Sequence, residues 1–462
     1  MSLFGIAASL GLLIYLSYRG HSILILAPLL AILAAVFSGG PPLGTYTQIF
    51  MSGLGGFLVV YFPIFLFGAV FGKLMEDSGS AAAIAQAAAR FLGPKRAIYS
   101  VVLACAVLTY GGVSLFVVAF AVYPIARQLF KESGTADRFI PAAIALGSFT
   151  FTMTAMPGSP AIQNAIPMPY FDTTLYAAPG LGMIASVIML GFGMAWLQIR
   201  SRKHDTSVAE LTSNPKPTDL SSGAASVRTL HWAIGFLPII VVLLGNALMV
   251  YVVLPLADTD YLASPTYGAT TVASVSGIWA ILVALAAACL VIILLQAKRL
   301  TSLKQSLSEG AQNALLPIAS TASLVGFGTV IASLSGFDTV RLALLDLFPE
   351  NPLISLSLAV NALAGITGSA SGGMSIALNT LGATYLELGQ QHGIDPALLH
   401  RVTSIATGGL DALPHNGAVV TLLSICGLTH RHAYFDIFVV AVLCPLIALV
   451  AVLFLGSTLG SF

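Results

Sequence analysis

Long apolar runs recur from one end of the chain to the other, and they limit its fold more than any other feature. Most of them approach the ~20 residues that cross a ~30 Å hydrocarbon core as an α-helix. Only 8% of the residues are charged, whereas soluble domains carry about a quarter charged residues. Backbone polar groups inside a bilayer must be paired internally, and long runs without alternation satisfy this as helices. The sequence therefore predicts an all-α polytopic membrane protein.

One polar connector divides the chain into two halves. Residues 199–231 contain Ser, Pro, Asp and Lys in a composition typical of a flexible linker. Basic clusters lie at residues 200–203 and 298–304, and the positive-inside rule places both in the cytoplasm. We expect residues 1–198 and 232–462 to form two halves of one fold, joined by a cytoplasmic linker.

The apolar segment 97–126 has basic residues beyond both of its ends, which the positive-inside rule places on one side of the membrane. About 30 helical residues extend only ~45 Å, too short for two crossings. A re-entrant hairpin resolves the conflict, with its tip at residues 110–114, where the paired glycines Gly111 and Gly112 permit a sharp turn.

Three short motifs of the first half recur in the second half, in the same order and at nearly constant spacing. They are residues 67–70 (FGAV) and 327–330 (FGTV), 111–114 (GGVS) and 372–375 (GGMS), and 155–161 (AMPGSPA) and 412–418 (ALPHNGA). We expect five crossings and one hairpin in each half, and because five is odd the second half must insert upside down. The sequence predicts two inverted repeats, with the second hairpin over residues 353–386 and its tip at residues 368–373.

Proline interrupts one apolar span in each half, at residues 156–160 and 413–417. Proline removes a backbone donor and clashes with the preceding turn, so we expect broken transmembrane helices over residues 139–168 and 402–428. The N-terminal ends of half-helices carry a partial positive charge that suits a carboxylate. Inverted repeats with interrupted helices are typical of secondary transporters, in which alternating access moves one unit against another.

Polar side chains and glycines gather around these breaks and hairpin tips. Such hydroxyls often bond only to neighbouring backbone, but their grouping favours a binding site for a small organic anion. The candidate substrate-binding residues are Gly111, Gly112, Ser114, Thr154, Gly158, Ser159, Gln163, Asn164, Thr367, Ser369, Ser371, Gly372, Gly373, Ser375, His415 and Asn416.

Asp411 and His415 are ionisable residues at predicted membrane depth, where such groups are costly and point to function. Either could carry a coupled proton, and Asp411 could instead cap the half-helix that follows Pro414. Arg138 and Arg401 precede the two broken spans. We expect both arginines to anchor span ends at the membrane interface, because arginine at such positions usually snorkels.

Residues 404–419 resemble the gluconate permease family, within the wider ion-transporter superfamily, and especially its 3-hydroxybutyrate permease branch. The segment 155–160 and the hairpin glycines fit the same family. The resemblance implies homodimeric elevator-type carriers of hydroxy monocarboxylates in the bacterial cytoplasmic (inner) membrane, usually coupled to protons. Gluconate carriers have a different Pro- and His-rich stretch at the first break, so the departure at residues 156–160 favours a smaller substrate such as 3-hydroxybutyrate.

The sequence thus predicts a proton-coupled symporter rather than an enzyme, without cofactor or metal, and with lipid rather than nucleic acid around it. A Na+-coupled carboxylate, dicarboxylate or citrate transporter is the main alternative, since unwound carbonyls at helix breaks can coordinate Na+. An intramembrane hydrolase would use Ser159 or Ser369 with His415. The chain has neither a Gly-x-Ser-x-Gly elbow nor a His-Glu-x-x-His motif.

Overall fold

The computed structural model describes residues 1–19, 21–93, 96–113, 115–204, 231–300, 302–346, 348, 351–414 and 416–462, and their regular structure is helical. The helices of the first half are α1 (Ser2–Tyr18), α2 (Ile23–Phe37), α3 (Pro42–Gly44), α4 (Met51–Asp77), α5 (Ser80–Leu92), α6 (Ala97–Tyr110), α7 (Leu115–Ser133), α8 (Ile140–Ser148), α9 (Phe151–Thr154), α10 (Ile162–Ala165), α11 (Met168–Phe171) and α12 (Pro179–His204). A π-helical turn, Thr45–Phe50, joins α3 to α4.

The second half repeats this succession of a helix pair, a long helix, a short helix, a hairpin, an interrupted helix and a final helix. Its helices are α13 (Trp232–Leu248), α14 (Leu254–Leu256), α15 (Val272–Gln296), α16 (Leu303–Ser333), α17 (Phe337–Asp346), α18 (Pro352–Thr367), α19 (Ala370–Gln391), α20 (Pro396–Thr407), α21 (Gly417–Ile425), α22 (His430–Phe438) and α23 (Cys444–Leu459), with a short 3-10 turn at Leu410–Ala412. α12 continues to His204, into the predicted linker, whose residues 205–230 lie outside the described chain.

The described chain contains six helices long and apolar enough to cross a membrane. They are Pro42–Asp77, Pro179–Arg202, Trp232–Leu256, Val272–Gln296, Leu303–Ser333 and His430–Leu459. Shorter apolar helices include the first arms of both hairpins. The protein is therefore an all-helical, multi-pass membrane protein, while the inverted orientation of its halves stays a prediction.

α4 and α16 form a closely packed antiparallel pair. A Cβ on Gly53, near the start of α4, would lie 2.8 Å from Thr329 Cβ near the end of α16. A Cβ on Gly310, near the start of α16, would lie 2.8 Å from Val70 Cα near the end of α4. Small residues allow membrane helices to approach this closely, so dispersion contacts hold the pair together.

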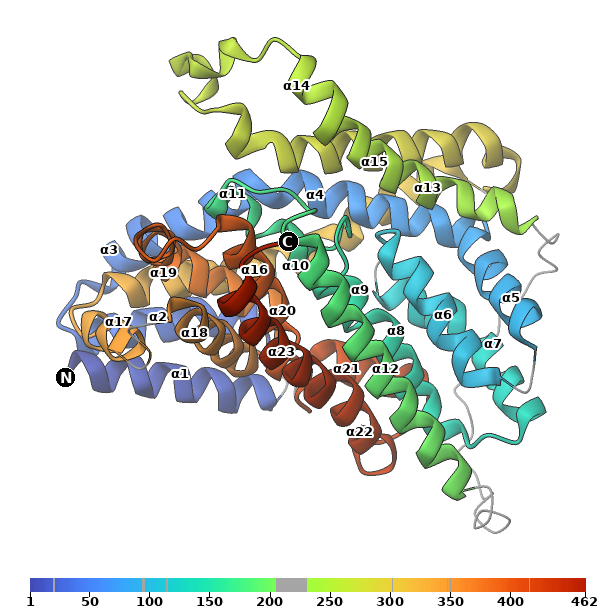
Figure 1. Ribbon diagram of the computed structural model, residues 1–462. Helices are drawn as coiled ribbons and strands as arrows, with labels where there is room; N and C mark the ends of the chain where they lie inside the picture. The colour runs from blue at the N-terminus through green and yellow to red at the C-terminus, as the bar shows by residue number, and fades with distance from the viewer. Residues whose placement is uncertain are drawn as a thin grey trace.

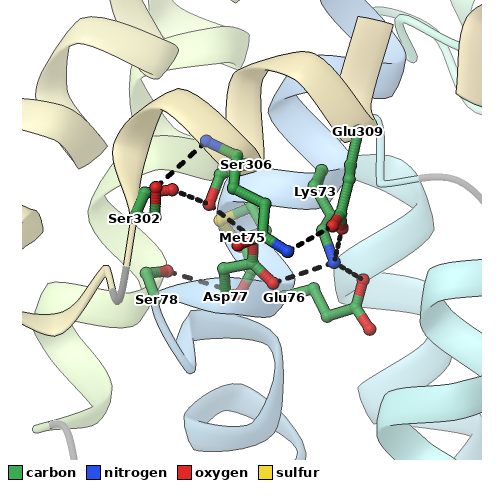
Figure 2. Close-up of polar contacts among 9 residues, drawn as sticks. Lys73, Met75, Glu76, Asp77, Ser78, Ser302, Ser306 and Glu309 are labelled. Carbon is green, nitrogen blue, oxygen red and sulfur yellow. Dashed lines mark hydrogen bonds and ion pairs between the residues drawn. The ribbon is translucent and has the colours of Figure 1, made fainter. Parts of the chain in front are cut away.

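An ionic cluster closes one end of the pair (Figure 2). Lys73 Nζ on α4 lies 3.0 Å from Asp77 Oδ1 on the same helix and 3.0 Å from Glu309 Oε2 on α16. Ser306 Oγ of α16 donates a hydrogen bond of 2.6 Å to Asp77 Oδ2. The cluster thus joins the two halves of the chain by directed polar contacts as well as by packing.

Both predicted hairpins are helix pairs joined by tight turns. α6 and α7 meet at Gly111 and Gly112, and Gly112 has a φ of 91°. α18 and α19 meet at Gly368, whose φ is 59°, and at Ser369. α6 has 14 residues and α18 has 16, and such helices extend only ~21 to 24 Å. These first arms are too short to span the bilayer, whereas α19, with 22 residues, extends ~33 Å, so the re-entrant path stays a prediction.

α8 and α20 occupy the interior of the bundle. Every residue of α8 is buried, and so is α20 from Leu398 onward. In Figure 1, α12 and α23 run side by side across the front of this region, α5 to α7 lie to the right, and α13 and α15 lie along the top. The buried pair α8 and α20 leads into the two predicted breaks. Residues 158–160 of the first break are buried, whereas Asp411, Leu413 and Pro414 of the second are partly exposed.

Candidate functional site

The first break separates α9 from α10. The chain leaves the helix after Thr154, passes through Pro157 and Pro160, and becomes helical again at Ile162. Ser159 Oγ donates to Thr152 O at 2.6 Å, which folds the loop back onto the end of the helix. This local bond compensates for backbone partners that the prolines remove.

The second break lies between α20 and α21. Asn416 Oδ1 accepts hydrogen bonds from Ala418 N (2.6 Å) and Val419 N (3.1 Å), and Asn416 Nδ2 donates to Asp411 O at 2.7 Å. Asn416 therefore caps α21 and also closes the loop before it. His415 lies outside the described residues.

The two breaks meet inside the protein. Ser404 Oγ on α20 donates to Thr154 O at 2.8 Å. A Cβ on Gly408, at the end of α20, would lie 3.3 Å from the Thr154 side chain. The predicted site residues of the first break thus adjoin the second break, although they are far apart in sequence.

Each hairpin contacts the break of its own half. Tyr110 Oη, at the end of α6, donates to Pro157 O at 2.8 Å, and a Cβ on Gly112 would lie 2.9 Å from Pro160 Cγ. On α18, Asn361 Oδ1 accepts a bond of 3.0 Å from Leu410 N. Hairpins and breaks therefore form one connected unit.

Other hairpin residues face elsewhere. A Cβ on Gly111 would lie 2.6 Å from Ile239 of α13, and Ser371 Oγ lies 3.5 Å from Thr321 Oγ1 of α16. The turn at the second tip comprises only Gly368 and Ser369, so Gly372 and Gly373 belong to α19. A Cβ on Gly373 would lie 2.2 Å from Ala364 N, which identifies this glycine as a packing contact between α18 and α19. Ser114 lies outside the described residues.

Most hydroxyls of the predicted site donate to backbone carbonyls at the ends of helices. The bonds run from Thr154 to Thr150 O (3.1 Å), Ser159 to Thr152 O (2.6 Å), Thr367 to Leu363 O (2.9 Å) and Ser375 to Ser371 O (2.7 Å). Ser369 Oγ caps α19 by accepting from Gly372 N at 3.1 Å. Of the predicted half-helix N-terminal ends, α19 is capped by Ser369 and α21 by Asn416, whereas α10 has no side-chain cap.

Two of the buried acceptors that lack a partner among the described residues lie at the breaks. They are Asp411 Oδ1 at the second break and Gln163 Oε1 at the first. A buried polar atom without a hydrogen bond is costly, and it marks the place where a proton, water or ligand would be stabilised. Each break thus has one unsatisfied acceptor in or next to it.

Arg401 corrects one sequence-based prediction. It is fully buried, so it does not snorkel to the membrane interface. The segment 171–179 covers this end of α20, and α20 itself lies in the interior, so the helix end that the sequence places near the interface is enclosed by protein. Arg138 is half-buried, with its guanidinium carbon 4.7 Å from the centre of the Phe139 ring.

His400, Tyr110 and Asn361 also take part in the site although sequence analysis did not select them. His400 is fully buried and lies 3.1 Å from Asn164 Oδ1 and 2.6 Å from Thr173 Oγ1. For His400 the available signal was a histidine next to an arginine on the helix that leads to a break. The described residues contain no group of three His, Cys, Asp or Glu that could hold a metal ion.

A cavity of about 620 Å³ lies next to this network, between the segment 171–179, the start of α20 and Tyr251. Asp172 and Asp395 are part of its lining. A bound carboxylate there would face like charges, so the cavity does not fit an anion site as well as the breaks do.

Residues 1–457 match the family model described as GntP family permease. The chain is also 42% identical over 458 residues to the uncharacterized transporter YxjC of Bacillus subtilis (strain 168), and the match covers 96% of each chain. Both likenesses extend over the two halves of the fold, including both breaks and both hairpins.

Proposed function

Because the chain belongs to the GntP permease family and is a multi-pass membrane transporter, we propose that it is a proton-coupled symporter of a small hydroxy monocarboxylate. 3-Hydroxybutyrate or gluconate is the substrate class, and the bacterial cytoplasmic membrane is the location. A transporter moves its substrate without transforming it, so this role is not enzymatic.

The observation that carries the proposal is the junction of the two breaks, together with a carboxylate oxygen of the second break that has no partner among the described residues. Ser404 holds the breaks together through Thr154 O, and Asp411 Oδ1 is buried without a partner among the described residues. A protonated Asp411 can donate to the anion, whereas an ionised one would repel it. Substrate and proton would therefore bind together, which is the requirement for symport.

In an elevator mechanism the hairpins and breaks would move as one unit against the long helices. Directed bonds between these two sets include isolated side-chain contacts: Tyr61 Oη to Ile166 O (2.8 Å), Asn379 Nδ2 to Thr329 Oγ1 (2.8 Å) and Tyr176 Oη to Leu243 O (3.4 Å). Such bonds can exchange partners during sliding. The α4 and α16 pair, held by packing and by the Lys73 cluster, would be the fixed scaffold and would form the homodimer.

Coupling to Na+ is the rival to proton coupling. It would require free carbonyl groups at the breaks. Arg401 already donates to the carbonyl of Ala155 at the first break and to those of Leu175 and Ala177 after α11. Fewer carbonyl ligands remain for Na+ there, which favours the proton.

A competition assay tests the substrate class. Uptake of labelled 3-hydroxybutyrate into proteoliposomes is measured with an excess of gluconate, lactate or citrate outside. The proposal expects the short hydroxy monocarboxylates to block uptake best. Strongest inhibition by citrate would assign the protein to the di- and tricarboxylate carriers instead, and release of a chemically altered product would indicate hydrolysis.

A further inference from the structure

We propose that Arg401 is the positioning residue of the substrate site, holding the two flanks of the first break together and supplying a permanent positive charge for the anion without touching it. This inference rests on the proposed transport of a carboxylate. In this inference Arg401, a side chain of the second half, determines the conformation of the break in the first half.

The bonding of Arg401 is complete. Nε donates to Ala177 O (2.9 Å), Nη1 donates to Ala155 O (3.1 Å) and Asn164 Oδ1 (3.1 Å), and Nη2 donates to Leu175 O (3.2 Å) and Ala177 O (2.6 Å). A guanidinium group has five N–H donors, and these bonds use all of them. No donor is left for a substrate carboxylate, so Arg401 acts at a distance.

The acceptors lie on both sides of the break. Ala155 directly precedes residues 156–160, and Leu175 and Ala177 follow α11. Asn164 reinforces the arrangement, because its Nδ2 donates to Ser159 O and Leu175 O, both at 3.0 Å. The planar, forked guanidinium group of Arg401 therefore links the residue before the break to the segment after α11, and the candidate site residues lie between these two points. A lysine ammonium, with three donors on one atom, cannot reproduce this geometry.

The charge of Arg401 is not paired. All its hydrogen-bond partners are neutral carbonyl or amide oxygens, and the side chain is fully buried. A charge in an environment of low dielectric acts over a longer range than one in water. The positive potential at the breaks therefore favours an anion over a neutral molecule of the same shape.

Gly182 on α12 provides an independent way to disturb the same fork. A Cβ at Gly182 would lie 2.4 Å from Ala155 O and 3.2 Å from Arg401 Nε. A Cβ at Gly191, on the same helix, would meet nothing within 4 Å. Gly182→Ala should displace the acceptor Ala155 O while keeping the positive charge of Arg401. Gly191→Ala is its matched control.

The experiment compares Arg401→Lys, Arg401→Gln, Gly182→Ala and Gly191→Ala in proteoliposomes. For each variant, we measure the concentration of labelled hydroxy acid that gives half-maximal uptake. We also measure how strongly the uncharged amide of the same acid inhibits that uptake. Thermal unfolding in detergent shows whether the variant is folded. We expect Arg401→Lys and Gly182→Ala to raise this half-maximal concentration roughly tenfold and keep the preference for the anion over the amide. We expect Arg401→Gln to lose that preference, and Gly191→Ala to match the wild type.

A second readout does not depend on transport. The native cysteines are buried, so a thiol introduced by Ala161→Cys reports access to the first break. We expect Arg401→Lys to accelerate labelling of this thiol, and Gly191→Ala to leave it unchanged. A wild-type anion preference in Arg401→Gln, or unchanged labelling in Arg401→Lys, would overturn the inference. If the wild-type protein takes up no hydroxy acid, the proposed function fails, while the labelling still decides the role of the fork.

Discussion

Ser404 Oγ and Thr154 O form a buried hydrogen bond of 2.8 Å between two interrupted helices that lie 250 positions apart in the chain. Arg401 and His400 make further bonds from the same helix to the first break. Three side chains on one face of α20 thus fasten the break of the first half to the second half. The site is a product of both halves, and neither half contains it alone.

The first prediction concerns this bond. Ser404→Ala would leave Thr154 O without its partner in the interior, at a cost of about 1–3 kcal/mol. Thr403→Val is the matched control, because Thr403 is fully buried and its hydroxyl has no partner among the described residues. We expect thermal unfolding in detergent to show a lower Tm for Ser404→Ala and an unchanged or higher Tm for Thr403→Val. Equal Tm values would contradict the role of the bond.

The second prediction concerns Asp411. Asp411→Asn keeps the shape of the side chain and removes its capacity to release a proton. We expect substrate exchange across the membrane to persist in this variant while accumulation driven by a pH gradient is lost. Wild-type uptake by an Asp411→Asn, His415→Ala double variant would rule out both residues as proton carriers.

The third prediction tests the packing of α4 against α16. Gly53→Ala would place a methyl group 2.8 Å from Thr329 Cβ, whereas a Cβ on Gly55 would meet nothing within 4 Å. Overpacking of this kind costs about 1–3 kcal/mol. We expect a lowered Tm for Gly53→Ala and not for Gly55→Ala. Similar Tm values for the two variants would mean that the pair is more loosely packed than described.

The fourth prediction concerns the ionic cluster of Figure 2. Lys73→Met would leave Glu76, Asp77 and Glu309 without their shared cation. We expect a loss of thermal stability that Glu309→Gln partly restores, because the double variant has one fewer unpaired carboxylate. Since these carboxylates are partly exposed, the loss should shrink at high salt. A stability independent of salt would show that the cluster contributes little.

The fifth prediction tests the elevator mechanism. Gly111, at the first hairpin tip, faces Ile239 on α13. A Gly111→Cys, Ile239→Cys pair, cross-linked by oxidation, would tie the hairpin to α13, one of the long helices against which it is proposed to move. We expect uptake to stop on oxidation and to recover on reduction, and substrate to slow the cross-linking. Full uptake by the oxidised protein would exclude relative movement at this contact.

Much of the fold could be predicted from the sequence because it depends on local properties. The apolar runs indicated membrane helices, and proline marked the interruptions after Thr154 and around Pro414. The glycines of the first hairpin marked a real turn. Those of the second were less informative, because a glycine can also serve helix packing, and Gly373 does so against Ala364.

The role of Arg401 could not be predicted from the sequence because it depends on distant segments. Its position just before the second broken span suggested an anchor at the membrane interface. Arg401 is interior because the segment 171–179 covers it. The hydroxyl groups show the same limit. Whether Ser159 faces a ligand or bonds to Thr152 O depends on how the loop turns back, and composition does not contain that information.

The most direct test of the account is accumulation of labelled 3-hydroxybutyrate in proteoliposomes under an imposed gradient. The account predicts accumulation when the outside is acidic, with no requirement for Na+, and loss of that accumulation in Asp411→Asn. Accumulation that follows a Na+ gradient at equal pH, or no uptake of any hydroxy monocarboxylate, would contradict it.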